Sequence, residues 1–205
     1  MLWIGITGPM GSGKSTVAHT LRQMGFEVLD ADEVARKILG PGTPGEAEVL
    51  STFGQHLQDK HGRLDRRALG RLVFNDRVKL EKLETIIHPR VRDEVARLRG
   101  ALAARGVVAA FYDVPLLFEK NMQDQFDSVL VVTADRALRD ARVATRSQLS
   151  AQEIAERNAR QLPPEIKEAK ASAVIRNNGT LTDLQSEIAR ALAKIGVRLP
   201  GPAHS

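Results

Sequence analysis

GPMGSGKS, at residues 8–15, is the stretch that decides the fold. It matches the pattern G-x-x-x-x-G-K-[ST] in full, and the short apolar run Leu2–Ile6 precedes it. Helical spacing of apolar residues follows it, from Ser15 through Met24. A strand, a glycine loop and a helix in this order separate a phosphate-binding loop from a chance string. The stretch therefore predicts binding of a nucleoside triphosphate.

The residues of this glycine loop are expected to bind different parts of a triphosphate and its Mg²⁺ ion. Glycines permit backbone angles and a close approach that a Cβ would forbid, so successive N–H groups can point at one anion. Lys14 adds a positive charge for the terminal phosphates, and Ser15 offers a hydroxyl to Mg²⁺. The expected nucleotide ligands are Gly11, Ser12, Gly13, Lys14, Ser15 and Thr16.

Composition limits the class of protein. A chain of 205 residues with 42% hydrophobic content fits one α/β domain that carries insertions. The net charge of +5 suits anionic partners. An aromatic content of 4% argues against a stacking platform for single-stranded nucleic acid and leaves binding through phosphates alone open. No segment has the pattern of a membrane span or a signal peptide. We expect a cytoplasmic protein, acting as a monomer, with neither nucleic acid nor membrane as a partner.

Five apolar segments alternate with helical patterns, as in a doubly wound α/β fold. The expected strands are Leu2–Ile6, Phe26–Leu29, Val107–Tyr112, Ser128–Val132 and Ala173–Ile175. They predict a five-stranded parallel sheet with helices on both faces. The last helix is the clearest, because apolar residues recur at helical spacing from Leu181 to Ile195 and Gly196 follows them.

The first long insertion, residues 33–105, exceeds what a crossover helix needs. Its expected helical pieces are Val34–Leu39, a helix through Phe53 that begins with a capping box of Thr43 and Glu46, Asp65–Phe74, and two segments meeting at His88-Pro89. By analogy with small-molecule kinases, an all-helical insertion of this kind forms an acceptor pocket.

The second insertion, residues 135–170, predicts a mobile helical lid with helices at Asp135–Ser147 and Ala151–Gln161. This leaves a core of residues 1–32, 106–134 and 171–196 in a single domain, residues 1–196, and a flexible tail at residues 197–205. Arginines recur on one face of the first lid helix, at Arg136, Arg139, Arg142 and Arg146. They form either a solvated face or a set that meets the transferring phosphoryl group. We favour Arg139 and Arg142 as catalytic.

Carboxylates follow two of the expected strands. Asp30 and Asp32 end the second strand, and alternation along an extended chain predicts that both face the glycine loop. One of them would orient an attacking hydroxyl, with Asp32 favoured; the alternative is that Asp32 caps a helix beginning at Glu33. Asp113 ends the third strand and is either part of the Mg²⁺ shell or a turn residue.

The turn Asn177-Asn178-Gly179 follows the fifth strand. Amide groups there would lie near the edge of a bound adenine, which makes Asn177 and Gly179 candidate nucleotide ligands, and an ordinary strand-to-helix turn is compatible with the same residues. Glu119, at the end of the segment PLLFE, is a weaker catalytic candidate. His88, before Pro89, is interpreted as marking a helix junction.

Together these motifs resemble the dephospho-CoA kinase family. The resemblance runs up to about residue 195 and rests on GITGPMGSGKSTVA, the DAD triplet, the PG loop near 41, FG at 53–54, G-x-L-D-R-x-x-L-x-x-x-V-F at 62–74, L-E-x-I-I-H-P at 83–89, D-V-P-L-L-F-E at 113–119, R-V-x-x-R at 142–146 and V-I-x-N-N-G at 174–179. It implies a P-loop kinase fold and transfer of the γ-phosphate of ATP, with Mg²⁺, to the ribose 3′-hydroxyl of dephospho-CoA. That reaction is the last step of coenzyme A synthesis.

The resemblance also implies roles for individual residues: residues 11–16 bind ATP, Asp32 is the base, and the segment around Arg142 is the lid. The chain departs from the family pattern at Pro9-Met10, at Ser172 and at Asn158, none of which touches the chemistry. The residues themselves leave open another small-molecule kinase, acting on a nucleoside, a nucleotide or a sugar. A switch GTPase and a nucleic-acid-stimulated ATPase are further alternatives.

Overall fold

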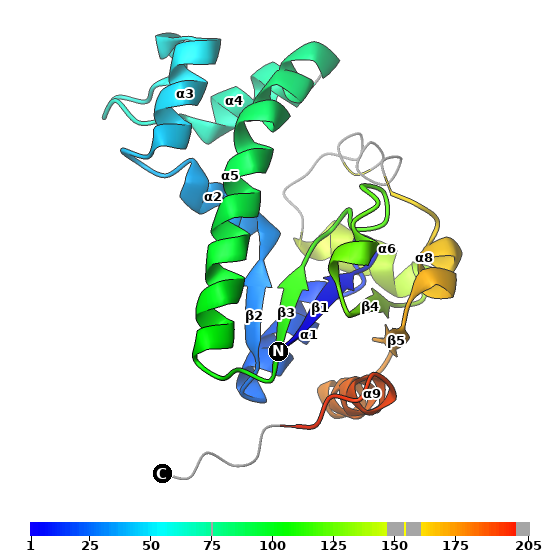
Figure 1. Cartoon of the computed structure of the whole chain (residues 1–205). Coiled ribbons are helices and arrows are strands. Elements are labelled where there is room, and N and C mark those ends of the chain that lie inside the picture. The colour runs from blue at the N-terminus through cyan, green and yellow to red at the C-terminus, as the bar shows by residue number, and fades with distance from the viewer. Residues whose placement is uncertain (75, 147–153, 155–160, 200–205) are drawn as a thin grey trace. The chain divides into compact units, whose positions relative to one another are not determined.

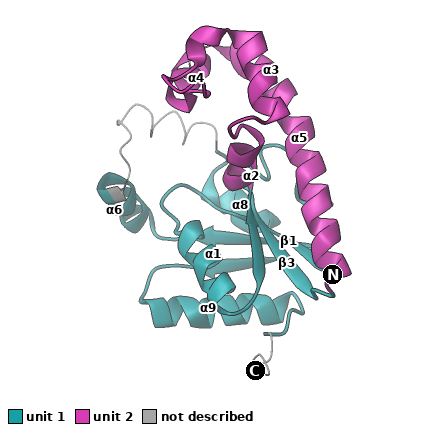
Figure 2. Cartoon of the chain, turned by 90° about the vertical axis from the view of Figure 1, so that its left-hand side faces the viewer, with its two compact units in different colours: residues 1–30, 106–205 teal, residues 31–105 magenta. Residues whose placement is uncertain are grey.

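The computed structural model describes residues 1–74, 76–146, 154 and 161–199. The chain divides into two compact units, which Figure 2 shows in different colours. One unit comprises residues 1–30 and 106–205 and contains the sheet, and the other comprises residues 31–105 and is built from helices. No helix in the described part of the chain has the length and apolar character needed to cross a membrane.

A single parallel sheet organises the first unit, with the strand order β2-β3-β1-β4-β5 (Figure 1). The strands are β1 Leu2–Thr7, β2 Glu27–Asp30, β3 Ala109–Asp113, β4 Ser128–Thr133 and β5 Ala173–Arg176. The glycine loop follows β1, the central strand, so it lies at the carboxyl edge of the sheet, where ligands of such folds bind. The predicted five-stranded parallel sheet is confirmed.

Apolar stripes of two helices cover one face of the sheet. The helices of this unit are α1 Lys14–Gln23, α6 Arg136–Arg146, α8 Pro164–Lys170 and α9 Leu181–Lys194, with a short 3-10 turn at Gln123–Gln125. Leu21 of α1 and Ile188 of α9 are buried in one core with Ile4 of β1. Because side chains alternate along a strand, Trp3 lies on the other face, where it stacks on Tyr112 at 5.7 Å between ring centroids. Burial of each such aliphatic side chain stabilises the folded protein by about 1.5–3 kcal/mol relative to its exposure to water.

Both ends of α9 lie close to where the sequence places them. Thr180 accepts a hydrogen bond from the Asp183 N–H, and the Asp183 carboxylate accepts one from the Thr180 N–H, which forms a complete capping box. The Thr180 hydroxyl also donates to the Asp183 carboxylate, at 2.7 Å, and together with the Thr180 N–H it holds the pKa of Asp183 below its ordinary value. Gly196, just past the helix, has φ of 74°, a left-handed conformation that favours glycine.

The second unit has its own apolar core. Its helices are α2 Ala31–Ile38, α3 Pro44–Phe53, α4 Arg66–Phe74 and α5 Arg77–Ala104, with a 3-10 turn at Gln55–Leu57. Buried leucine, valine and isoleucine side chains from α3, α4 and α5 pack together in this core. Thr43 caps α3 as predicted, since its hydroxyl accepts a hydrogen bond from the Glu46 N–H at 3.2 Å. The other half of the predicted capping box was wrong, because the Thr43 N–H donates to the Gly40 carbonyl and the Glu46 carboxylate accepts from the Gly42 and Leu64 N–H groups.

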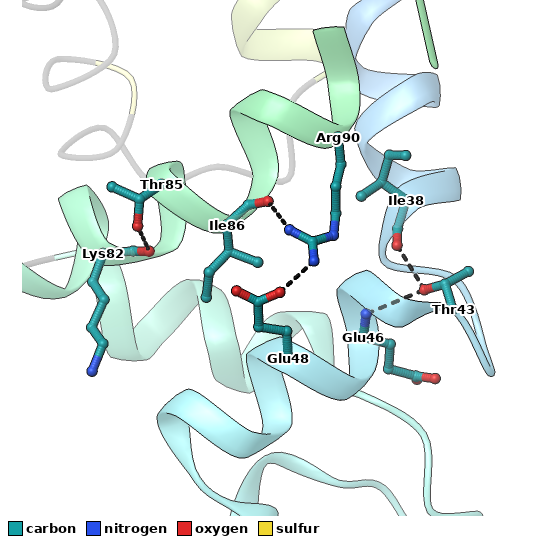
Figure 3. A network of polar contacts seen from close by, with 8 residues as sticks. All are labelled: Ile38, Thr43, Glu46, Glu48, Lys82, Thr85, Ile86 and Arg90. Atoms are coloured by element: carbon teal, nitrogen blue, oxygen red, sulfur yellow. Dashed lines mark hydrogen bonds and ion pairs between the residues drawn. The ribbon is translucent and has the colours of Figure 1, made fainter. Parts of the chain in front are cut away.

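The prediction of two helical segments meeting at His88-Pro89 was wrong. α5 runs without interruption from Arg77 to Ala104 and contains Pro89. Pro89 lacks the N–H that would bond four residues back, but burial of Leu83 and Ile86 holds the helix on the core. Arg90 adds a further link, because its guanidinium donates to the Ile86 carbonyl and forms an ion pair with Glu48 of α3 (Figure 3). Tertiary packing therefore outweighs the loss of one helical hydrogen bond.

Of the two helices predicted for the lid, one lies in the described part of the chain. The first lid helix, predicted at Asp135–Ser147, is present as α6, described over Arg136–Arg146. The second, predicted at Ala151–Gln161, falls almost entirely outside the described residues.

An ion cluster in the second unit predicts a pH dependence of stability. Glu94, 16% exposed, accepts hydrogen bonds from Arg97 and from Lys37, which lower its pKa from 4.5 to about 2. Since the unfolded carboxylate binds protons more readily, this stabilisation is complete above about pH 5 and is lost as the pH falls toward 2. We expect Glu94→Gln to lower the free energy of unfolding at pH 7 by about 1–2 kcal/mol.

Urea unfolding of both proteins at pH 7 and pH 3 measures this effect. The difference in unfolding free energy between wild type and variant should shrink at pH 3, because the carboxylate of the unfolded chain is protonated there while that of the native protein stays largely ionised. A difference that is equal at the two pH values would contradict the role assigned to Glu94.

Candidate active site

The glycine loop leaves β1 and turns directly into α1. Gly13 is the N-cap of α1 with φ of 88°, and Gly11 has φ of 76°, both in the left-handed region that favours glycine. Neighbouring atoms add a steric requirement. A Cβ on Gly8 would lie 2.1 Å from the Val132 carbonyl oxygen, and one on Gly13 would lie 2.1 Å from Asn177 Nδ2. The loop glycines are therefore required by contact as well as by backbone angle.

The start of α1 presents hydrogen-bond donors and positive charge. The Lys14 and Ser15 N–H groups in the first turn of α1 lack acceptors within the helix, and the helix dipole adds partial positive charge there. The Thr16 N–H donates to the Gly13 carbonyl at 3.0 Å. The Lys14 ammonium folds back over the loop and donates to the Gly8 carbonyl at 3.1 Å. Ser15 is exposed. This arrangement fits the polyphosphate tail of a nucleotide.

Arg142 and Asn177 brace the loop from outside. The Arg142 guanidinium donates to the Asn177 carbonyl at 2.9 Å and to the Gly11 carbonyl at 3.5 Å. The Asn177 side chain, which is buried, donates from Nδ2 to the Ser12 carbonyl at 3.0 Å. The structure thus joins α6, the turn after β5 and the glycine loop through residues that the sequence singled out separately.

The other predicted lid arginine also lies against the loop. A Cβ on Gly11 would lie 2.5 Å from the Arg139 carbonyl oxygen, so the backbone of α6 approaches the loop closely at this point. The Arg139 guanidinium donates to the Ala134 carbonyl at 3.0 Å. Arg136 differs, because it is exposed and faces Asp140 at 3.7 Å. The arginines of α6 therefore do not form one uniform solvated face.

The turn after β5 is hydrogen-bonded to the residue before α6 and lies against the first turn of α9. Asn178 Nδ2 donates to the Asp135 carboxylate at 2.8 Å, and Asn178 Oδ1 accepts from the Asp135 N–H at 2.9 Å. A Cβ on Gly179 would lie 2.5 Å from the Asp183 carboxylate, which belongs to the cap of α9. Gly179 thus has a structural requirement in addition to its predicted place beside a nucleotide.

A cavity of about 700 Å³ lies beside the loop, within the size range of ligand pockets. It is lined mostly by polar atoms. Its walls include Pro9 of the loop, Arg139 of α6, residues 161–165 and Asn178.

Asp113 lies at the same sheet edge as the loop. It is the last residue of β3, is 8% exposed, and pairs in register with Ile6 of β1 and with Asp30 of β2. The Asp113 carboxylate and the Ser15 hydroxyl are the hard oxygen donors that Mg²⁺ prefers. Among the described residues no group of three or more metal-binding side chains gathers. This donor set fits Mg²⁺, which uses few protein ligands together with substrate phosphates.

Asp32 is placed differently from its prediction. α2 begins at Ala31, directly after β2, so Asp32 lies in the first helical turn. The expectation that Asp30 and Asp32 alternate along an extended chain was therefore wrong, and so was the alternative of a helix beginning at Glu33. Within the helical unit, Asp32 lines a cavity of about 320 Å³ together with Arg36, Arg66 and a floor of leucines.

The structure adds two polar residues that sequence reasoning missed. Gln161 Oε1 accepts a hydrogen bond from the Met10 N–H of the glycine loop at 3.2 Å. Lys167 of α8 is fully buried and pairs with Glu119 at 2.7 Å. The sequence marks Glu119 only as a weaker catalytic candidate. α8 has seven residues, too few for its periodicity to signal a buried lysine.

Loss of the Asn177 side chain should weaken nucleotide binding. We expect Asn177→Ala to raise KM for ATP about 5- to 30-fold, because the Ser12 carbonyl loses its buried donor at a cost of ~1–2 kcal/mol. Steady-state kinetics with varied ATP measure the change. Gln185→Ala, an exposed amide on α9, is the control and should leave KM unaltered. An Asn177→Ala variant with the KM of the wild type would contradict the proposal that the Asn177 side chain supports the glycine loop.

Comparison with known proteins agrees with this architecture. A sequence model of the dephospho-CoA kinase family matches residues 2–183. A dephospho-CoA kinase of Corynebacterium glutamicum is 40% identical over 195 residues, which cover 95% of this chain and 98% of the relative. The crystal structure of TT1252 from Thermus thermophilus matches with a TM-score of 0.80 and 40% identity over 98% of both chains. The dephospho-CoA kinase from Campylobacter jejuni matches with a TM-score of 0.69 and 28% identity over 94% of this chain and 96% of its own. The chain belongs to the dephospho-CoA kinase family.

Proposed function

We propose that the protein transfers the γ-phosphate of ATP to the ribose 3′-hydroxyl of dephospho-CoA, giving coenzyme A and ADP. The main support for this proposal is the extent of the family match, because the model of the dephospho-CoA kinase family matches residues 2–183. A glycine loop alone is shared by many nucleotide-binding proteins, whereas this match also spans the whole helical unit at residues 31–105. The alternative acceptors left open by the residues are therefore not favoured.

The two units suit the two substrates. We assign ATP to the glycine loop and its neighbouring cavity, with residues 135–170 as the lid, and the acceptor to the helical insertion at residues 33–105. The cavity of the helical unit supports the second assignment, because Arg36 and Arg66 contribute positive charge and its floor is apolar. Such a lining fits an acceptor that joins phosphates to a long, uncharged pantetheine arm.

The residues would act mainly by positioning and by electrostatics, because phosphoryl transfer asks little covalent chemistry of the protein. The amides of residues 11–16 hold the phosphates of ATP, and Lys14 balances the charge on the moving phosphoryl group. Asp32 orients the ribose hydroxyl for direct in-line attack. Arg139 and Arg142 stabilise the transferring group from the lid. Mg²⁺ held by Ser15 and Asp113 would neutralise phosphate charge.

Both proposed substrates are water-soluble small molecules. We therefore propose that the protein acts in the cytoplasm as a monomer, with neither membrane nor nucleic acid as a partner.

A panel of acceptors tests the proposed function. Purified protein with ATP and Mg²⁺ is offered dephospho-CoA, a nucleoside, a nucleoside monophosphate and a hexose in separate reactions. Mass spectrometry should detect a phosphorylated product with dephospho-CoA and none at a comparable rate with the others. Faster phosphorylation of any other acceptor would overturn the assignment.

A further inference from the structure

A buried ion pair lies close to the glycine loop. Lys167 of α8 has no exposed surface, and its Nζ is 2.7 Å from Glu119 Oε1. Glu119 follows β3, is 11% exposed, and uses the same oxygen to accept a hydrogen bond from the Leu162 N–H at 2.7 Å. Within the described part of the chain, Glu119 Oε2 has no hydrogen-bond partner. The carboxylate thus joins an ammonium group and a backbone amide.

Such a pair does little for stability by itself. Moving two charges out of water costs several kcal/mol per ion, and an apolar pair of similar volume is often as stable. Burial lowers the pKa of Lys167, the Glu119 carboxylate opposes that shift, and the positive charge of Lys14 adds to it.

The ion pair of Lys167 and Glu119 helps to hold the segment of residues 161–164 in place. Residues 161–164 lie in the second insertion and lead into α8, which begins at Pro164, and they form part of the wall of the 700 Å³ cavity. Gln161 attaches this segment to the glycine loop through the Met10 N–H, and Leu162 attaches it to Glu119. Lys167 holds Glu119 in place from the following helix. Two successive residues of the returning chain are therefore anchored beside the loop.

We propose that Lys167 is a positioning residue that, through Glu119 and the Leu162 amide, holds residues 161–164 against the glycine loop and so sets the affinity for ATP. We call these three groups the buried latch. The role of the buried latch rests on the proposed function, because that function assigns ATP to the loop and the cavity. Lys167 itself is not a catalytic residue in this scheme.

The test uses the double variant Glu119→Met with Lys167→Met. It removes both charges together and keeps side-chain volume, so the variant should fold where a single replacement would leave one buried charge unpaired. We expect KM for ATP to rise about tenfold, the effect of one lost hydrogen bond. KM for dephospho-CoA should stay within twofold of the wild-type value. Lys170→Met, the same replacement at an exposed position of α8, is the matched control and should behave as wild type.

Two results would overturn the proposal. One is a folded double variant whose KM for ATP lies within twofold of the wild-type value. The other is an equal rise in KM for both substrates, which indicates a general loss of structure. Calorimetric titration of the same proteins with ATP and Mg²⁺, without acceptor, measures the dissociation constant directly. Wild-type protein that binds ATP but leaves dephospho-CoA unmodified would refute the proposed function, and the titration would still decide the role of the buried latch.

Discussion

Replacement of Lys14 by methionine is expected to lower kcat for phosphoryl transfer about 10²–10³-fold. The Lys14 ammonium lies over the glycine loop, bonded to the Gly8 carbonyl, and is the point charge that the loop provides for the terminal phosphates. Methionine keeps the length and apolar stem of the side chain, so the loop should retain its shape. The loss should therefore appear as a chemical defect in a folded protein.

Single-turnover kinetics at saturating ATP and dephospho-CoA measure the Lys14 effect separately from product release. Lys60→Met, an exposed lysine of the helical unit, is the control and should turn over as the wild type does. A Lys14→Met variant with a rate within threefold of wild type would contradict the assignment of Lys14.

Asp32→Asn is expected to lower kcat about 10²–10⁴-fold while KM for ATP changes little. Asparagine preserves shape but cannot accept the proton of an attacking hydroxyl as a carboxylate does. Glu33→Gln is a matched control, because it neutralises the next carboxylate in the same first turn of α2. Its rate should remain near that of the wild type.

The same series separates Asp32 from Asp30. Asp30 ends β2 and lies in register with Asp113 at the edge of the sheet, so it is the competing candidate. Asp30→Asn should reduce the rate less than Asp32→Asn does. If Asp30→Asn gives the larger loss and Asp32→Asn keeps the wild-type rate, the orienting role belongs to Asp30.

The sheet and the glycine loop could be predicted because their signals are local. Gly11 and Gly13 adopt left-handed backbone angles, which residues with a Cβ disfavour. Each strand is a short apolar run between turn residues. Thr43 and Thr180 mark helix starts through bonds to residues three positions away. Such features depend on a few adjacent residues, which a sequence displays directly.

Features set by tertiary contacts could not be predicted in the same way. Pro89 indicates a break in a helix, but the packing of Leu83 and Ile86 carries α5 through it. The proposed catalytic role of Arg142 came from a repeated spacing, whereas its observed partners, the carbonyls of Gly11 and Asn177, are distant in sequence. The short charged segment around Lys167 predicts a surface residue, but in the structure Lys167 is fully buried and pairs with Glu119, which is distant in sequence.

The reaction with dephospho-CoA, ATP and Mg²⁺ tests the central claim most directly, with the product examined by mass spectrometry and by phosphorus NMR. The proposed function predicts that dephospho-CoA gains one phosphoryl group, attached to the ribose 3′-oxygen, as ADP forms. Formation of ADP with the acceptor unchanged, or a phosphate on any other atom, would contradict it.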